Sequence, residues 1–219
     1  MVVTIDGPAG SGKSSAARAL AERLDYEFLD TGAMYRAVAL SCLKNEIDPD
    51  NEEAVAALTR SLEIKFQDGR LFVNDQEVTD DIRSSAVSSA ASVVAQHSSV
   101  REILVDLQRA CASSSPLVTE GRDQGTVVFP HAFCKFFLTA RPEVRAQRRY
   151  DETPKNDDRP AFAELVREIR ERDERDANRS VAPLKPADDA ISIDTSDSAL
   201  EEVVSSMETI VRDKIKDRV

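Results

Sequence analysis

The residues best suited to chemistry are the eight from Gly7 to Ser14, which read Gly-Pro-Ala-Gly-Ser-Gly-Lys-Ser. This run matches the pattern G-x-x-x-x-G-K-[ST] of a phosphate-binding loop. Its glycines let the backbone wrap closely round phosphate oxygens and present N–H groups at the positive end of a helix. Lys13 can reach the β- and γ-phosphates, and the Ser14 hydroxyl can bind Mg²⁺. The loop therefore predicts binding of a nucleoside triphosphate.

The elements on either side of this loop are those that the motif needs. Residues 2–6 form a short apolar, β-branched run typical of a buried strand, and residues 16–24 carry apolar side chains at helical spacing. A glycine-rich turn that joins a strand to a helix without a ligand is the alternative. We expect the nucleotide phosphates to contact Gly7, Pro8, Ala9, Gly10, Ser11, Gly12, Lys13, Ser14 and Ser15.

Two further polar groups follow predicted strands, one at residues 30–36 and one at residues 120–126. Each offers a short polar residue, a glycine that allows close backbone approach, and an arginine that can bind phosphate bidentately. In an open parallel sheet, ligands bind outside the carboxyl ends of the strands, where both groups would lie. Either group alone could instead be a turn with a surface arginine.

A third group of charges lies in residues 170–179, at the end of a predicted helix. Leu165 and Ile169 mark the apolar face of this helix, and Arg172, Asp176 and Arg179 continue it. Charges that prolong an inward face need a partner, and a bound anion would supply one. The alternative is a solvated helix held by ion pairs between successive turns.

Arginines also precede a polar stretch, residues 151–158, that we expect to be mobile. They are Arg141, Arg145, Arg148 and Arg149. This pattern indicates a hinged lid, which would exclude water and direct cations toward a phosphoryl group in transfer. A polar loop without function is the alternative.

Five short apolar runs predict the core strands, at residues 2–6, 26–30, 116–120, 134–138 and 190–194. Helical segments separate them, which predicts a doubly wound parallel sheet of the α/β class. Alternating apolar residues at 62–66, a turn at Asp68 and Gly69, and a return at 71–73 predict a small inserted antiparallel sheet. Residues 84–112 read as helix with a break near His97.

Composition restricts the function further. A net charge of −11 argues against binding to nucleic acid or to anionic membranes, because both require a basic surface. No apolar run approaches the roughly 20 residues of a membrane span. The 3 cysteines and 2 histidines show no metal-binding spacing, and we expect reduced thiols in a cytoplasmic protein. Nothing in the sequence demands more than a monomer.

Taken together, these motifs resemble those of bacterial cytidylate kinases, from residue 3 to about residue 210. The motifs that carry the resemblance are the phosphate loop, Leu29–Arg36, Gly121–Asp123 with Gly125–Thr126, and Arg172–Asp173 through Asn178–Arg179 with Ala182–Leu184. Two positions depart from the family pattern. Gln124 stands where an aliphatic residue is usual, and Ser14-Ser15 replaces a more common Ser-Thr or Gly-Thr.

The resemblance implies phosphoryl transfer from ATP, with Mg²⁺, to CMP and dCMP. By motif, the acceptor site would comprise Thr31, Arg36, Ser92, Arg101, Arg122, Asp123, Arg172, Asp176 and Arg179. Lys13, Arg145 and Arg149 would be catalytic, and Ser14 would bind the metal. The implied division is a core of residues 1–35, 113–147 and 161–219, an acceptor-binding part of residues 36–112 with its insert at 62–80, and a lid of residues 148–160.

Several other functions compete with this one. A kinase that acts on UMP, AMP or shikimate could share the same core. A nucleotide-dependent switch is a different class, but the sequence lacks the guanine-reading Asn-Lys-x-Asp run, and a switch would not need a second arginine-rich site.

Overall fold

The computed structural model describes residues 1–67, 69–113, 115–152 and 160–217 of the chain. These residues form two compact units. The first comprises Met1–Leu29 and Cys111–Val219, and the second comprises Asp30–Ala110. The finer division predicted from the sequence stays a prediction.

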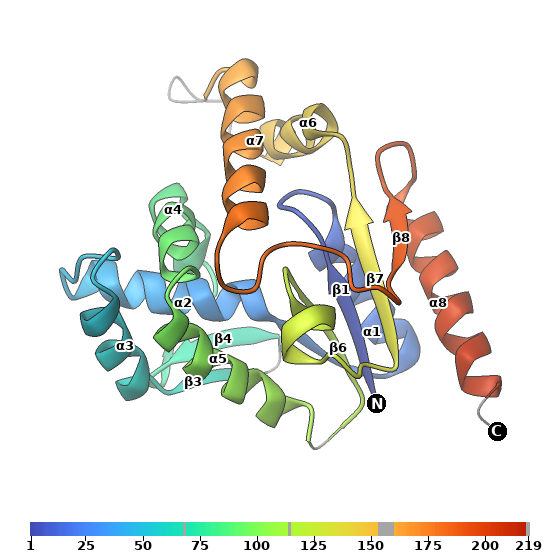
Figure 1. Ribbon diagram of the computed structural model, residues 1–219, viewed down its shortest axis with the longest axis horizontal. Helices are drawn as coiled ribbons and strands as arrows, with labels where there is room; N and C mark the ends of the chain where they lie inside the picture. The colour runs from blue at the N-terminus through green and yellow to red at the C-terminus, as the bar shows by residue number, and fades with distance from the viewer. Residues whose placement is uncertain (68, 114, 153–159, 218–219) are drawn as a thin grey trace. The chain divides into compact units, whose positions relative to one another are not determined.

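A five-stranded parallel sheet forms the centre of the first unit. Its strands stand in the order β2 (Glu27–Asp30), β6 (Leu117–Gly121), β1 (Val2–Asp6), β7 (Cys134–Thr139) and β8 (Ile191–Asp194). Figure 1 shows β6, β1, β7 and β8 side by side, with β1 next to β7. The α/β class and the parallel sheet predicted from the sequence are confirmed.

The strands are apolar because the sheet is buried in a common core. Ile5 on β1 and Leu138 on β7 are both 0 % exposed. Two helices, α1 (Lys13–Leu24) and α8 (Leu200–Lys216), pack into the same core through Leu20 and Met207. Truncating a buried leucine of this kind typically costs about 2–5 kcal/mol. This core fixes the carboxyl end of β1, where the phosphate loop begins.

Helices α6 (Pro142–Glu152) and α7 (Phe162–Asn178) pack on one another in the first unit. Ala146, Leu165 and Ile169 form their shared apolar cluster. Of the lid predicted at 148–160, residues 148–152 form the last turn of α6 and residue 160 precedes α7. The predicted mobility of its middle part, residues 153–159, lies outside the described residues.

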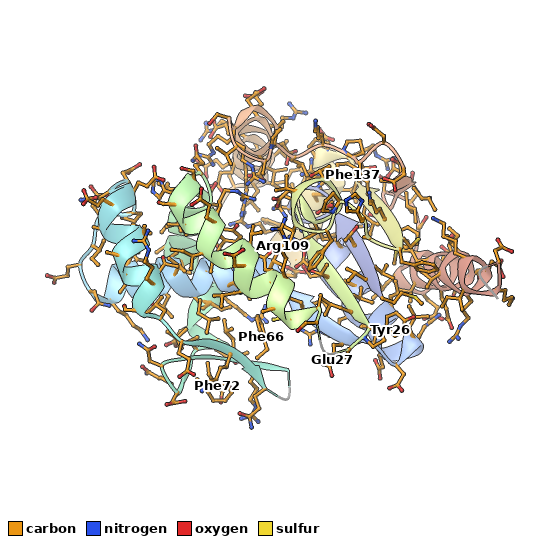
Figure 2. The ribbon with its side chains drawn as sticks, turned by 60° about the horizontal axis from the view of Figure 1, so that its bottom comes forward. Tyr26, Glu27, Phe66, Phe72, Arg109 and Phe137 are labelled. Atoms are coloured by element: carbon orange, nitrogen blue, oxygen red, sulfur yellow. The ribbon has the colours of Figure 1, made fainter. Side chains whose placement is uncertain are left out.

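The second unit combines helices with a small sheet. Its elements are α2 (Thr31–Lys44), α3 (Glu52–Ser61), β3 (Ile64–Gln67), β4 (Arg70–Val73), β5 (Gln76–Glu77), a 3₁₀ turn (Asp81–Arg83), α4 (Ser85–Val94) and α5 (Ser98–Cys111). Antiparallel pairing in the order β3-β4-β5 confirms the predicted insert. Phe66 pairs with Leu71, so Phe66 and Phe72 point to opposite faces, as Figure 2 shows.

Capping residues explain where these helices begin. The predicted break near His97 is confirmed, since α4 ends at Val94 and α5 begins at Ser98. The Glu52 carboxylate accepts a 3.0 Å hydrogen bond from the backbone N–H of Ser99 in the first turn of α5. Helix α2 begins at Thr31, directly after β2, because Asp30 accepts from the backbone N–H of Ala33 at 2.8 Å.

Candidate functional site

The phosphate loop depends on its glycines for steric reasons. A side chain at Gly7 would place its Cβ 2.1 Å from the backbone oxygen of Leu138, and one at Gly10 would lie 3.1 Å from Cβ of Arg145. Gly10 and Gly12 adopt positive φ angles of 76° and 83°, which favour glycine. Helix α1 begins directly after Gly12 without a side-chain cap. Its positive N-terminus is therefore suited to bind an anionic phosphate group.

A buried carboxylate, Glu120, organises the two functional side chains at the end of the loop. It is 3 % exposed and lies on β6, next to β1 in the sheet. Its Oε1 accepts a 2.7 Å hydrogen bond from the Ser14 hydroxyl, and its Oε2 lies 3.6 Å from Nζ of Lys13. Lys13 also lies 3.5 Å from the backbone oxygen of Pro8. Contacts within the chain therefore hold both side chains in place.

The donor set at Ser14 and Glu120 fits a magnesium ion. Hydroxyl and carboxylate oxygens are the ligands that Mg²⁺ prefers, usually one or two from the protein beside phosphate oxygens and water. Across the described ranges, no group of three or more histidine, cysteine, aspartate or glutamate side chains could hold a metal.

Arg145 links the phosphate loop to α7. Its side chain is 3 % exposed, and its Nη1 donates to the backbone oxygen of Ala9 at 3.2 Å. Nη1 and Nη2 also bind the two carboxylate oxygens of Asp173 at 2.9 and 2.5 Å, while Nε donates to Ala140 O at 2.8 Å. The cation thus lies beside the loop in a fixed orientation. Arg149 is half-buried on the same helix.

A second arginine of α6, Arg148, contacts the loop both directly and through a threonine. Arg148 Nη1 donates to Gly10 O at 3.3 Å, and its Nη2 donates to Thr195 O at 2.6 Å. The Thr195 hydroxyl lies 2.9 Å from Ser11 O, so this residue closes the other side of the loop. Thr195 was not among the residues predicted from the sequence. Its only signal was its place directly after β8, at the carboxyl edge of the sheet.

Four residues predicted for the acceptor site lie together in the first unit. Arg122 Nε donates to Asp176 Oδ2 at 2.8 Å, and Arg179 Nη2 lies 3.8 Å from Asp123 Oδ1. Asp123 and Arg179 side chains are each only 5 % exposed. Arg179 follows the last residue of α7, so the charged face predicted for this helix extends one residue past its end. We call these four residues the acceptor cluster.

Charges within this cluster stabilise one another. Burial alone would raise the pKa of Asp176, but Arg122, followed by Arg172 and Arg179, outweighs burial and lowers that pKa below its usual value. Burial likewise opposes the charge of Arg122, yet Asp176 and Glu120 raise the pKa of the guanidinium. Asp176 and Arg122 therefore each favour the charged form, and arginines outnumber carboxylates once Arg172 is included.

The other predicted acceptor residues belong to the second unit. Thr31 is buried at the start of α2, and Arg36 donates from Nε to Gly32 O at 3.2 Å and lies 3.5 Å from Asp30. Arg101 is 4 % exposed on α5, and its guanidinium carbon lies 5.7 Å from the centre of the Tyr35 ring. Ser92 is half-buried on α4. That they join the acceptor cluster round one ligand stays a prediction.

A parallel α/β sheet with a phosphate-binding loop after β1 defines the class of P-loop nucleotide-binding proteins. The fold is similar to shikimate kinase from Bacteroides thetaiotaomicron, with a TM-score of 0.51, 12% identity and coverage of 97% of this chain and 98% of that one. It is also similar to a gluconokinase from Sinorhizobium meliloti 1021, with a TM-score of 0.50, 18% identity and coverage of 99% and 94%. At these identities the similarity concerns the fold alone.

Sequence comparison narrows this class to one family. The cytidylate kinase family model matches residues 3–213, and the chain belongs to the cytidylate kinase family. It is 42% identical over 219 residues to the cytidylate kinase of Halalkalibacterium halodurans, covering 98% of this chain and 99% of that one. It is 45% identical over 210 residues to that of Shewanella piezotolerans, covering 93% and 91%. The protein is therefore an enzyme of the transferase class.

Within the part of the chain that the structure describes, no helix combines the length and the apolar character that a membrane span requires.

Proposed function

We propose that the protein transfers the γ-phosphoryl group of ATP to the phosphate of CMP or dCMP, forming ADP with CDP or dCDP. The observation that carries this proposal is the acceptor cluster, which lies in the same compact unit as the phosphate loop. A protein that only hydrolysed or sensed a nucleoside triphosphate would not need a second buried site for an anion. The cytoplasmic location and the monomeric state stay predictions.

In this proposal the phosphate loop binds ATP and holds its γ-phosphate in line with the acceptor. Lys13 contributes its charge to the β- and γ-phosphates, and the backbone N–H groups of residues 7–15 enclose them. A magnesium ion bound at Ser14 would neutralise charge that develops on the phosphate oxygens. The attacking group is already a phosphate oxygen, so the transfer requires no general base.

The acceptor would be recognised by charge and by hydrogen-bond pattern. Arg36, Arg122 and Arg179 hold its phosphate, while Arg172 and Asp176 hold its sugar. Ser92, Arg101 and Asp123 read the base, and Thr31 lines the site. A carboxylate can accept from the exocyclic amine of cytosine and an arginine can donate to the ring carbonyl; uracil lacks that amine.

Arg145 and Arg149 would serve the transition state from α6. Arg145 already directs a buried guanidinium at the phosphate loop through Ala9. Cations beside the transferred group stabilise the charge on its equatorial oxygens, and a closing lid would keep water from accepting the phosphoryl group instead. This part of the proposal is tested separately from the choice of acceptor.

A coupled ADP-release assay tests the function directly. The protein is given ATP and Mg²⁺ with CMP, dCMP, UMP, AMP or shikimate as separate acceptors, and Lys13→Ala purified in the same way controls for contaminating kinases. Fast turnover on CMP and dCMP with slow turnover on the others is expected. Fast turnover on another acceptor would refute the assigned roles of Ser92, Arg101 and Asp123. Turnover on none would refute the kinase proposal.

A further inference from the structure

The last residue of β1, Asp6, joins the phosphate loop to the acceptor cluster. It is 3 % exposed and directly precedes Gly7. Its Oδ1 accepts a hydrogen bond from the backbone N–H of Gln124 at 2.8 Å, and its Oδ2 accepts one from Gly125 at 2.7 Å. Both donors belong to the single π-helical turn Gln124–Val128, which follows Arg122 and Asp123 without a gap.

The pairing of the strands explains why one carboxyl group reaches both N–H groups. Strands β1 and β6 run parallel, and Asp6 pairs with Gly121, where β6 ends. The chain then passes through Arg122 and Asp123 and turns back beside Asp6. Two successive peptide groups bound to one carboxyl group have fixed orientations, since each N–H must point at its own oxygen. This fixes the backbone immediately after Asp123.

The turn is also closely packed at Gly125. A Cβ added at Gly125 would lie 3.0 Å from Oγ1 of Thr4 and 3.1 Å from Cδ of Lys135. The same Cβ would lie 3.4 Å from Oδ2 of Asp6, so the turn has no room for a side chain where it packs on β1 and β7. The Asp123 backbone oxygen also accepts from Val127 N at 2.9 Å, which ties the residue to the turn.

We propose that Asp6 is a positioning residue for the acceptor: through the backbone of residues 124 and 125 it sets the places of Asp123 and Arg122, and with them acceptor affinity. This inference rests on the proposed function, in which Asp123 reads the base and Arg122 holds the acceptor phosphate. Asp6 itself does not touch the acceptor.

The electrostatic setting of Asp6 supports a role beyond packing. Burial raises its pKa to about 7, although the two backbone N–H groups lower it; Asp123 raises it further and Arg122 lowers it. Lys135, which packs against the same turn, directs its ammonium group to Pro130 O at 2.7 Å and to Asp189 at 2.8 Å. An ionisable group kept in such a place is disfavoured by desolvation, and groups of this kind are concentrated at functional sites.

The test compares Asp6→Asn with wild type. Asparagine has the same size but only one acceptor oxygen, so one of the two backbone N–H groups would face an amide N–H. The matched control is Asp194→Asn, because Asp194 also ends a core strand and accepts from a backbone N–H, that of Ser196, at 2.8 Å. KM for CMP, KM for ATP and kcat are measured for each, with CMP binding measured without ATP by equilibrium dialysis.

We expect Asp6→Asn to raise KM and Kd for CMP about tenfold or more while KM for ATP changes less than about twofold, with Asp194→Asn like wild type. Equal increases in KM for CMP and KM for ATP would show that Asp6 supports the phosphate loop or general stability, and would overturn the proposal. Unchanged KM values would also overturn it. If Asp6→Asn does not fold, Gly125→Ala displaces the same turn, because its methyl group would press on Thr4 and Lys135. That variant is judged by the same comparison of KM for CMP with KM for ATP. If the wild-type enzyme used another acceptor, only the proposed function would be refuted. The changes in KM for that acceptor and for ATP would then be compared in the same way.

Discussion

The Ser14 hydroxyl donates a 2.7 Å hydrogen bond to Glu120, although 106 residues separate the two in sequence. The bond places a buried carboxylate directly behind the residue expected to bind magnesium. A partner of this kind orients a metal ligand, and its loss typically reduces metal affinity or activity about 10–100-fold.

Glu120→Gln is therefore expected to lower kcat about 10–100-fold and to raise the Mg²⁺ concentration needed for half-maximal rate. The amide keeps the size of the side chain but loses the charge that balances Lys13 at 3.6 Å. Rates measured over a range of Mg²⁺ concentrations check this. Glu27→Gln, an exposed glutamate at the start of β2 (Figure 2), is the matched control. A normal Mg²⁺ dependence would refute the role.

Removing the lysine of the phosphate loop should abolish turnover without unfolding the protein. Lys13→Ala is expected to lower kcat by about 10²–10³ or more, because its charge acts on the phosphates in the transition state. Circular dichroism and urea unfolding would show whether the fold persists. Lys44→Ala, which removes an exposed ion pair with Asp81, is the control and should leave the rate unchanged. Near-normal activity of Lys13→Ala would contradict the central assignment.

Local patterns explain why the fold and the phosphate loop could be predicted. Buried strands appear as short apolar runs, the loop has a fixed spacing, and the alternation at 62–66 marks the inserted sheet. The break at His97 followed from residues next to it in the chain. Each of these signals lies within a dozen residues, where sequence dictates local structure directly.

Contacts between distant segments could not be predicted in the same way. Glu120 was predicted only as a member of the polar group 120–126, without a role, and Thr195 and Asp6 were not predicted as site residues. Their partners are 106, 184 and at least 118 residues away in sequence. Only the strand order brings them together. The common signal was a polar residue at the carboxyl end of a core strand, and that signal does not say which neighbour the side chain will bind.

Two ion pairs between α6 and α7, Arg145–Asp173 and Arg170–Glu143, should differ greatly in their effect on stability. Arg145 is 3 % exposed, so Asp173→Ala would leave a buried guanidinium without its bidentate partner and lower the free energy of unfolding by about 2 kcal/mol or more. Glu143→Ala breaks the ion pair between Glu143 and Arg170, two side chains that are each more than half exposed. It should lower the free energy of unfolding by less than about 1 kcal/mol. Urea unfolding of both variants checks this. Similar losses would show that Arg145 does not depend on Asp173.

The choice of acceptor should depend on Asp123. Asp123→Ala removes the carboxylate that would accept from the cytosine amine, and we expect KM for CMP to rise at least tenfold, corresponding to about 1.4 kcal/mol. KM for ATP should change little, because Asp123 lies outside the phosphate loop. Steady-state kinetics with each substrate varied separately provide the comparison. An equal loss for both substrates would mean that Asp123 only supports the fold through Arg179, which lies 3.8 Å away.

The stability of the protein should depend on pH through Asp6. Its pKa is about 7 in the folded protein and 3.8 in an exposed carboxyl group, so between these values the folded state keeps a proton that the unfolded state has released. The unfolded state then binds fewer protons, and the contribution of Asp6 to the free energy of unfolding falls as pH rises from about 4 to 7 and is constant above that.

The asparagine in Asp6→Asn does not ionise. The hydrogen bond that this variant loses lowers its free energy of unfolding by the same amount at every pH. Wild type should therefore lose stability relative to Asp6→Asn between pH 5 and pH 8, by at least about 1.4 kcal/mol, the equivalent of one pKa unit. Urea unfolding of both proteins at these two values measures the difference, and titrating groups that do not interact with Asp6 cancel in the comparison. A difference in stability that did not change with pH would mean that Asp6 ionises at its ordinary pKa despite its burial.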